Sequence, residues 1–174
     1  MLLNYELIEN KDSKEVPLVL LHGLFGSLSN LGMLARAFME RRTILQVDLR
    51  NHGKSGHSGD FNYEVMSKDV LETLDHLKIK KFSVIGHSMG GKIALKLTSI
   101  AKDRVEQAVI LDICPRRNIC NLHSNIFTAL LAVKSQQLSS RSEAAAVMRK
   151  YMQEESACAE FSVKVTDVAG KSAQ

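Results

Sequence analysis

Residues 81–100, KFSVIGHSMGGKIALKLTSI, carry an apolar run, a glycine-rich turn and a helical pattern in immediate succession. The run KFSVI is typical of a buried parallel strand, and the apolar residues after the turn recur at helical spacing. The turn, Gly86 to Gly90, reads G-x-S-x-G, a pattern that exposes a serine hydroxyl when it joins a strand to a helix. We therefore expect Ser88 at the carboxyl end of a central strand, with its Oγ facing a pocket. A chance match of five residues in an ordinary strand–helix turn is the alternative.

Similar apolar runs alternate with helical patterns along the first part of the chain. The runs span 17–21, 43–49 and 105–113, and the helical patterns span 31–38 and 66–77. This alternation predicts an α/β fold of right-handed βαβ units, with a mostly parallel sheet between helices on both faces. Residues 4–8 are expected to add an antiparallel edge strand.

The alternation stops after Pro115. Apolar residues within 126–131 and 144–152 recur at helical spacing and predict two consecutive amphipathic helices. These helices would form a short helical cap, which serves either as a substrate lid or as a cover for the end of the sheet. The chain is expected to divide into a core at 1–115, a cap at 116–155 that completes the domain 1–155, and an irregular or frame-shifted tail at 156–174.

Composition excludes several classes of protein. A chain of 174 residues with 45% hydrophobic and 24% charged residues fits one globular domain and not a disordered or fibrous chain. The net charge of +4 is spread over scattered basic residues, so we expect no nucleic-acid partner. Three cysteines without paired spacing indicate neither a disulfide framework nor a metal site, and favour the cytoplasm. No apolar run approaches the roughly 18 residues of a membrane span, so no membrane attachment is expected.

A second chemical signal follows the run at 17–21. The sequence HGLFGS at 22–27 is a glycine-rich loop after a predicted strand, where a fold with a G-x-S-x-G turn takes one backbone N–H of its oxyanion hole. Leu24 is the preferred donor, and Phe25 either replaces it or lines the acyl pocket. The other donor is the N–H of Met89, at the start of the helix after the serine. The histidine of the loop, His22, is expected to hydrogen-bond loop backbone.

Three motifs, HGLFGS at 22–27, VDLRNHGKS at 47–55 and GHSMGG at 86–91, together resemble the α/β-hydrolase superfamily. More narrowly, NLGMLARAF, DLRNHG, GHSMGGK and LDICP are similar to bacterial YbfF-type esterases, small cytoplasmic serine hydrolases of short acyl esters and thioesters. The resemblance implies an acyl-enzyme on Ser88, a small acyl ester or thioester as substrate, and no cofactor or metal. On the same basis Asp112 is the acid that orients the catalytic histidine. Substrate binding is assigned to Phe25 and His87.

Other expectations concern the loop DLRNHG and the general base. Asp48, Asn51 and His52 fall in a loop that is mainly architectural in this superfamily, so they are assigned to turn hydrogen bonds. The family's catalytic histidine lies after the last strand, and none of the six histidines here occupies a matching position. The base is therefore assigned to no residue, and the chain is expected to be C-terminally truncated, as a fragment or by a frameshift, and weakly active. Apolar surface at residues 108–111 of the last predicted strand is expected to be exposed as a result. A non-catalytic remnant and another superfamily enzyme, such as a menaquinone-pathway lyase, are the alternatives.

Overall fold

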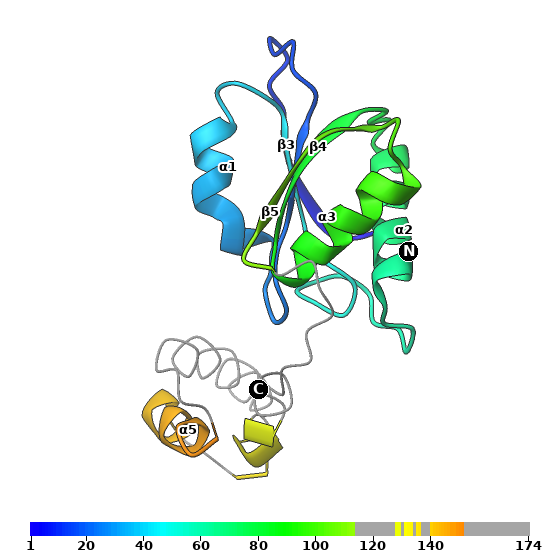
Figure 1. The fold of residues 1–174 in the computed structure, drawn as a ribbon. Coiled ribbons are helices and arrows are strands. Elements are labelled where there is room, and N and C mark those ends of the chain that lie inside the picture. The colour runs from blue at the N-terminus through cyan, green and yellow to red at the C-terminus, as the bar shows by residue number, and fades with distance from the viewer. Residues whose placement is uncertain (114–127, 130, 134, 137–139, 152–174) are drawn as a thin grey trace. The chain divides into compact units, whose positions relative to one another are not determined.

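A computed structural model describes residues 1–113, 128–129, 131–133, 135–136 and 140–151. The chain divides into two compact units, Met1–Pro115 and Arg116–Gln174, and each is described by itself. The first unit contains a sheet with helices packed against it (Figure 1).

Five strands of the described residues form this sheet, in the order β1-β3-β2-β4-β5. Their bounds are β1 Tyr5–Ile8, β2 Leu18–Leu21, β3 Ile44–Val47, β4 Phe82–His87 and β5 Val105–Leu111. The strand β1 runs antiparallel to β3, and the other neighbouring pairs are parallel. The structure thus confirms the mostly parallel sheet and the antiparallel edge strand that the sequence predicts.

Helices cover both faces of the sheet. On one face lies α1 (Gly32–Phe38), which follows the short 3-10 helix η1 (Leu28–Leu31), and on the other lie α2 (Tyr63–His76) and α3 (Met89–Ile100) (Figure 1). These three α-helices coincide with the predicted helical patterns. The start of α2 is fixed by Asn62, whose side-chain oxygen accepts a hydrogen bond from the N–H of Val65 at 3.0 Å.

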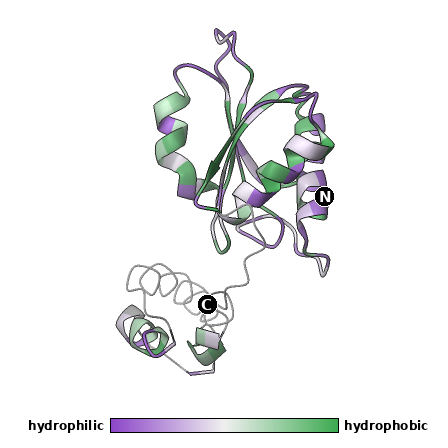
Figure 2. Ribbon diagram, in the orientation of Figure 1, coloured by the Kyte–Doolittle hydropathy of each residue, from purple (hydrophilic) through white to green (hydrophobic). Residues whose placement is uncertain are grey.

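Apolar side chains of the inner strands alternate between the two faces and are buried on both, and the strands are mostly hydrophobic along their length (Figure 2). The core under α2 and α3 includes Val19, Leu21, Leu45, Val47, Val84, Val70, Leu74, Ile93 and Leu97. The core under α1 includes Leu18, Leu20, Ile44, Ile85 and Ala35. Burial on both faces is the reason that these strands appear in the sequence as continuous apolar runs.

The strand β5 departs from this pattern. Its apolar run alone predicts a buried strand, but Val109 is 47% exposed and only the two ends of the strand are partly buried, which agrees with the exposure expected for residues 108–111. Among the described strands, β5 pairs with β4 alone. It is therefore the edge of the described sheet, and an apolar run by itself does not distinguish an edge strand from a central one.

In the second unit, α5 spans Arg141–Met148. Its N-cap is Ser140, whose Oγ accepts a hydrogen bond from the N–H of Glu143 at 3.3 Å. Ala144 and Met148, four residues apart on this helix, are buried, as the helical spacing predicts. Several residues of the predicted pair of helices lie outside the described residues: Ile126, Phe127, Leu130 and Met152.

A buried ion pair fastens the loop after β3 to α2. Arg50 donates through Nε to Asp69 Oδ2 at 2.6 Å and through Nη2 to Oδ1 at 2.8 Å, and both side chains are almost fully buried. Nη1 of the same guanidinium donates to the carbonyl oxygen of Asp60. These hydrogen bonds to Asp69 raise the pKa of Arg50 above its ordinary value. The pair is bidentate, so it fixes the orientation of the loop as well as its position.

Removing the negative partner of this pair is expected to destabilise the fold. Asp69→Asn keeps the side-chain volume but leaves the buried Arg50 charge uncompensated, which typically lowers the free energy of unfolding by about 3–5 kcal/mol. Asp75→Asn on the same helix is the matched control, since Asp75 pairs with Arg104 while 65% exposed, and exposed pairs contribute only about 0–1 kcal/mol. Urea denaturation followed by circular dichroism measures both. Equal shifts in the two variants would contradict a special role for the buried pair.

Candidate active site

The proposed nucleophile lies at the turn between β4 and α3. Ser88 has φ 50° and ψ −113°, a left-handed conformation that is rare for a residue with a side chain. Its N–H donates to the carbonyl oxygen of Leu111 at 2.9 Å, which ties the turn to the end of β5. The strained serine stands at the carboxyl end of a strand that is paired on both sides, as the G-x-S-x-G pattern predicts.

The glycines of this turn are required by close backbone contacts. A Cβ on Gly86 would lie 2.2 Å from the carbonyl oxygen of Gly90, and a Cβ on Gly90 would lie 2.2 Å from the carbonyl oxygen of Leu21. Neither neighbour is a side chain that could move away. Only glycine at both positions lets α3 begin this close to β4 and β2.

The loop after β2, residues 22–28, which we term the oxyanion loop, passes beside Ser88. A Cβ on Gly23 would lie 3.4 Å from Ser88 Cβ, so the two segments are in van der Waals contact. From residue 25 to residue 28 every backbone N–H of the loop has an acceptor: His52 Nε2 for Phe25, the Gly23 carbonyl oxygen for Gly26, Asn30 Oδ1 for Ser27 and Asp48 Oδ1 for Leu28. The N–H of Leu24 has none among the described residues, and neither has that of Met89.

These hydrogen bonds distinguish the two candidates for the loop donor. The sequence favours Leu24 and leaves Phe25 as the alternative. In the structure the Phe25 N–H is bound to His52 Nε2 at 3.0 Å, whereas the Leu24 N–H has no acceptor within the described part of the chain. The geometry therefore favours Leu24, together with Met89 at the amino end of α3.

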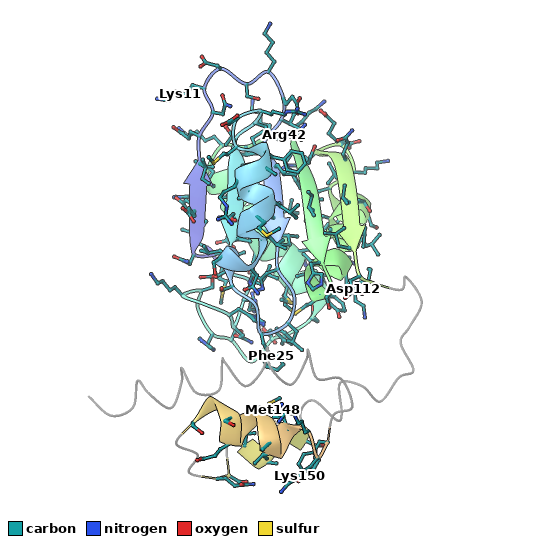
Figure 3. All side chains as sticks on the ribbon, turned by 90° about the vertical axis from the view of Figure 1, so that its left-hand side faces the viewer. Lys11, Phe25, Arg42, Asp112, Met148 and Lys150 are labelled. Carbon is teal, nitrogen blue, oxygen red and sulfur yellow. The ribbon has the colours of Figure 1, made fainter. Side chains whose placement is uncertain are left out.

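The proposed acid and the elbow histidine lie at the same edge of the sheet. Phe25 and Asp112 are at one end of the strands, and Lys11 and Arg42 are at the other (Figure 3). Asp112 follows the last residue of β5, has φ 54° and is 83% exposed. Its Oδ2 lies 3.5 Å from Nε2 of His87, the only ion-pair contact of Asp112 with a described residue.

Two histidines of the site region are occupied in structural hydrogen bonds. His22 Nε2 accepts the N–H of Leu49 at 3.0 Å, so its Nδ1 carries the proton and donates to the Gly23 carbonyl oxygen at 2.7 Å. His22 is thus the backbone-binding loop residue that the sequence predicts. The other, His52, also bonds to backbone through both ring nitrogens: Nε2 accepts the N–H of Phe25, and Nδ1 bonds to the carbonyl oxygen of Arg50.

The described residues place no histidine nitrogen in a hydrogen bond with Ser88 Oγ. His57 and His76 are exposed on a loop and at the end of α2, and His123 lies outside the described residues. The arrangement brings together a strained serine, two unpaired N–H groups and a carboxylate at one edge. The part that would complete proton transfer is not among these contacts.

The sequence assigns the polar residues of the loop 48–55 to hydrogen bonds within their own turn. In the structure this loop also binds distant segments. The carboxylate of Asp48 is 2% exposed and accepts three hydrogen bonds, from the N–H of Leu28 at 2.7 Å, the N–H of Lys54 at 2.9 Å and the side chain of Asn4 at 2.7 Å. Gly53 has φ 54°, and a Cβ there would lie 2.2 Å from the Asp48 carboxyl carbon. Asp48 therefore joins the oxyanion loop to Asn4, just before β1, and to its own turn, a link between distant segments that no local pattern reveals.

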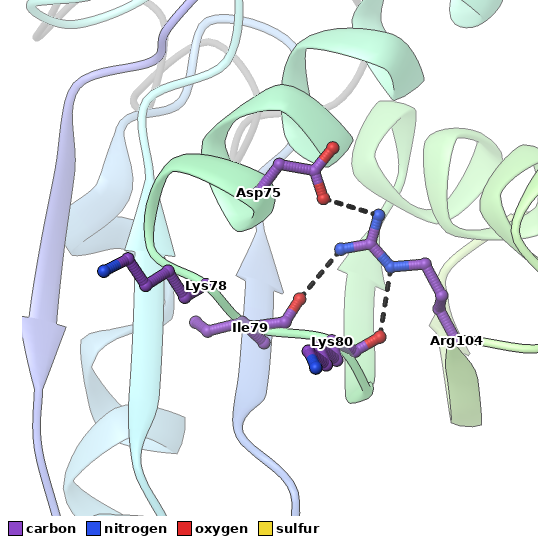
Figure 4. Close-up of a pocket in the computed structure, with 5 residues that line it drawn as sticks. All are labelled: Asp75, Lys78, Ile79, Lys80 and Arg104. Carbon is purple, nitrogen blue, oxygen red and sulfur yellow. Dashed lines mark hydrogen bonds and ion pairs between the residues drawn. The ribbon is translucent and has the colours of Figure 1, made fainter.

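A pocket of about 490 Å³ lies away from these residues and is lined by Asp75, Lys78, Ile79, Lys80 and Arg104 (Figure 4). Lys80 precedes β4 and Arg104 precedes β5, so the pocket is at the amino ends of these strands. Arg104 donates to the carbonyl oxygens of Ile79 and Lys80 and pairs with Asp75 at 2.8 Å. Its charged group is thus used to hold the α2–β4 connection, and the pocket is not the candidate site.

In the described part of the chain, no group of three or more histidine, cysteine or acidic side chains is arranged to hold a metal ion. No helix within the described ranges is both long enough and apolar enough to cross a bilayer.

Comparison with known proteins gives the family. A family model described as the alpha/beta hydrolase fold matches residues 16–154. The chain belongs to the alpha/beta hydrolase family. It is 47% identical over 139 residues, 80% of its length, to the esterase YbfF of Escherichia coli, and 39% identical over 140 residues, 79% of its length, to the sn-1-specific diacylglycerol lipase ABHD11 of Danio rerio. These matches confirm the resemblance drawn from the motifs.

Solved structures agree with the fold. A marine microorganism esterase superposes with a TM-score of 0.81 at 27% identity, over 95% of this chain and 63% of that one. The chain covers 55% of the Escherichia coli esterase and 43% of the Danio rerio lipase. It therefore spans about half the length of the curated relatives that it matches.

The elbow contacts predict that a single methyl group will disrupt the site. Gly90→Ala is expected to lower the free energy of unfolding by at least about 3 kcal/mol, because the added Cβ meets backbone of β2 that cannot yield. Gly59→Ala is the matched control, since a Cβ there meets nothing within 4 Å. Thermal unfolding of the two variants compares them. A Gly90→Ala protein as stable as Gly59→Ala would show that α3 does not pack as closely as described.

Proposed function

We propose that this chain carries the nucleophile and oxyanion hole of an esterase-type serine hydrolase that forms an acyl-enzyme on Ser88. The observation that carries the proposal is the strained Ser88 at the β4–α3 turn, next to two backbone N–H groups, those of Leu24 and Met89, that have no acceptor among the described residues. Most backbone N–H groups of folded proteins are paired. Two such groups beside a strained serine support a site that binds a developing oxyanion.

The reaction begins with attack of Ser88 Oγ on the carbonyl carbon of an ester, while a general base takes the hydroxyl proton. The carbonyl oxygen becomes an oxyanion and accepts hydrogen bonds from Leu24 and Met89. The partial positive charge at the amino end of α3 stabilises the same oxyanion. The tetrahedral intermediate collapses as the alcohol leaves with a proton. Water then attacks the acyl-enzyme, and the carboxylic acid is released with Ser88 restored.

Asp112 is assigned as the acid of the site. In this role it holds a catalytic histidine in the required tautomer and stabilises its charged form. Its exposed carboxylate at the end of β5 supports this role, because a carboxylate buried in structural bonds, such as that of Asp48, would not be available. The base itself is assigned to no described residue. The chain alone is therefore expected to hydrolyse esters only weakly. Its rate should be about 10³ to 10⁴ times the rate in water, which is the residual catalysis found when a triad member is missing.

Short acyl esters are the proposed substrates. The resemblance to YbfF-type esterases adds acyl thioesters to this proposal. The names of the relatives, an esterase and an sn-1-specific diacylglycerol lipase, support an ester as the scissile group. Phe25 and His87, both partly exposed beside the serine, are assigned to the acyl side of the site. Unpaired cysteine spacing favours a reducing cytoplasm as the setting. A non-catalytic remnant and a lyase of the same fold are the rival functions.

Covalent labelling separates a nucleophile from an idle serine. A fluorophosphonate probe is expected to label the wild-type chain at Ser88, slowly because no described residue is assigned as the base, and Ser88→Ala should abolish the labelling because the attacking oxygen is gone. Ser99→Ala, at an exposed serine of α3, is the control and should label as wild type does. Mass spectrometry of the adduct gives the site. An adduct that persists in Ser88→Ala, or a wild-type chain that never reacts, contradicts the proposal.

Asp112 should matter for turnover and not for folding. Asp112→Asn is expected to leave the denaturation midpoint unchanged, because the side chain is 83% exposed and its one described ion pair is at 3.5 Å. In a form of the protein complemented with the segment that carries the family's histidine, the same change should lower kcat by about 10⁴. Hydrolysis of a short-chain aryl ester measures the rate. A near-normal kcat would place the acid elsewhere.

A further inference from the structure

The oxyanion loop contains a turn that is strained at a residue with a large side chain. The N–H of Gly26 donates to the carbonyl oxygen of Gly23 at 3.0 Å, so residues 23–26 form a four-residue turn. Its third residue, Phe25, has φ 60°. That position favours glycine or asparagine when φ is positive, and phenylalanine adopts it at a cost in free energy. Some contact must offset this cost for the turn to persist.

His52 makes that contact from the neighbouring loop. Its Nε2 accepts the N–H of Phe25 at 3.0 Å, and its Nδ1 lies 2.8 Å from the carbonyl oxygen of Arg50. A backbone N–H can only donate, so Nε2 must be unprotonated, and Nδ1, which faces a carbonyl oxygen, must carry the proton. The two contacts therefore select one neutral tautomer of a side chain that is 8% exposed. His52 presents a fixed lone pair to the peptide bond between Leu24 and Phe25.

We propose that His52 is a positioning residue of the oxyanion hole: it engages the N–H of the Leu24–Phe25 peptide and so holds the turn in which the Leu24 N–H, on the preceding peptide, is the loop donor left without an acceptor among the described residues beside Ser88. The proposal rests on the proposed function for its catalytic consequence, and on the geometry alone for the peptide orientation. His52 touches no reacting atom in this scheme. It acts through the backbone of the loop.

The physical basis is a choice between two orientations of one peptide. In the ordinary alternative for a four-residue turn, the third residue has negative φ and the central peptide is rotated by about half a turn. That rotation would point the Leu24 carbonyl oxygen at His52 Nε2, so that two acceptors would face each other. The Nδ1–H tautomer, fixed by the Arg50 carbonyl oxygen, thus penalises the relaxed turn and favours the strained one. A proton on Nε2 would reverse this preference.

The flanks of the turn have little freedom to compensate. On one side, a Cβ on Gly26 would lie 2.6 Å from His22 Nδ1, so the loop is packed tightly on that ring. On the other side, the Leu28 N–H is bound to Asp48 Oδ1 at 2.7 Å. Both ends of the turn are therefore held, and the orientation of the central peptide is the remaining variable. The contact from His52 is the one that sets it.

A first measurement needs no mutation. Long-range ¹H–¹⁵N correlation spectra of the wild-type chain report which ring nitrogen of His52 carries the proton. The expected result is a protonated Nδ1 and an unprotonated Nε2 at neutral pH. A proton found on Nε2 overturns the proposal, because that nitrogen could then not accept the Phe25 N–H.

A second measurement tests the peptide itself with matched variants. Hydrogen exchange of the Phe25 amide is compared in wild type, His52→Gln and His52→Leu, with His76→Leu at an exposed histidine of α2 as the control. Gln can place its side-chain oxygen near the position of Nε2 and accept the N–H, whereas Leu cannot. Exchange is expected to be about tenfold faster in His52→Leu, as the loss of one hydrogen bond implies, and near wild type in the other two. Equal protection in a folded His52→Leu protein overturns the proposal.

The catalytic consequence is read from the rate of fluorophosphonate labelling at Ser88. His52→Leu should slow labelling by about tenfold or more, because the turn that positions the Leu24 N–H is then no longer held, and His52→Gln should restore most of the rate because Gln can hold the turn again. Equal labelling rates in His52→Leu and wild type, with altered Phe25 exchange, overturn the positioning role. A wild-type chain that does not label refutes the proposed function, and the tautomer and exchange results then decide the peptide orientation by themselves.

Discussion

The site depends first on the contact between two glycines of one turn. Gly86 and Gly90 leave no space for a methyl group, so α3 starts against the backbone of both β4 and β2. That approach forces Ser88 into the left-handed region and directs the helix N–H groups to the serine. It also sets where the oxyanion loop can pass, because Gly90 touches the carbonyl oxygens of Leu21 and His22. The proposed nucleophile and the proposed oxyanion donors are thus fixed by one packing constraint.

The loop 48–55 supplies the second layer of support. Asp48 and His52 accept N–H groups of the oxyanion loop, and Arg50, between them, is fixed to α2 by a buried bidentate pair. Positive φ values at Phe25 and Asn51 show that both loops store strain, which these hydrogen bonds offset. The segment therefore links the buried ion pair to the candidate oxyanion hole through consecutive residues. Its polar side chains are buried because each has specific backbone or ionic partners.

Local patterns in the sequence predicted the parts of the fold that local physics determines. Runs at 17–21 and 81–85 are buried on both faces, and the G-x-S-x-G turn needs only its own residues and its flanking elements to be recognised. Features that depend on distant partners were not predictable in this way. The bonds of Asp48 to Leu28 and Asn4, and that of the Phe25 N–H to His52, 27 residues away, join segments that no local pattern connects. The preference for Leu24 and the exposure of residues 108–111, by contrast, were both expected from the sequence.

The register of two parallel strands explains how the proposed acid, Asp112, is placed near the proposed nucleophile, Ser88. His87 at the end of β4 pairs with Leu111 at the end of β5, so the next residues, Ser88 and Asp112, emerge side by side. The Ser88 N–H bond to the Leu111 carbonyl oxygen fixes this register at its last step. Both residues then take positive φ, which turns the chain away from each strand in the same manner. Proximity of these two groups is therefore a property of the sheet itself, whereas the position of a proton-transfer partner must be set by a separate element. Because attack by Ser88 Oγ requires that its proton be taken, the proposed acylation depends on that separate element as well as on the sheet.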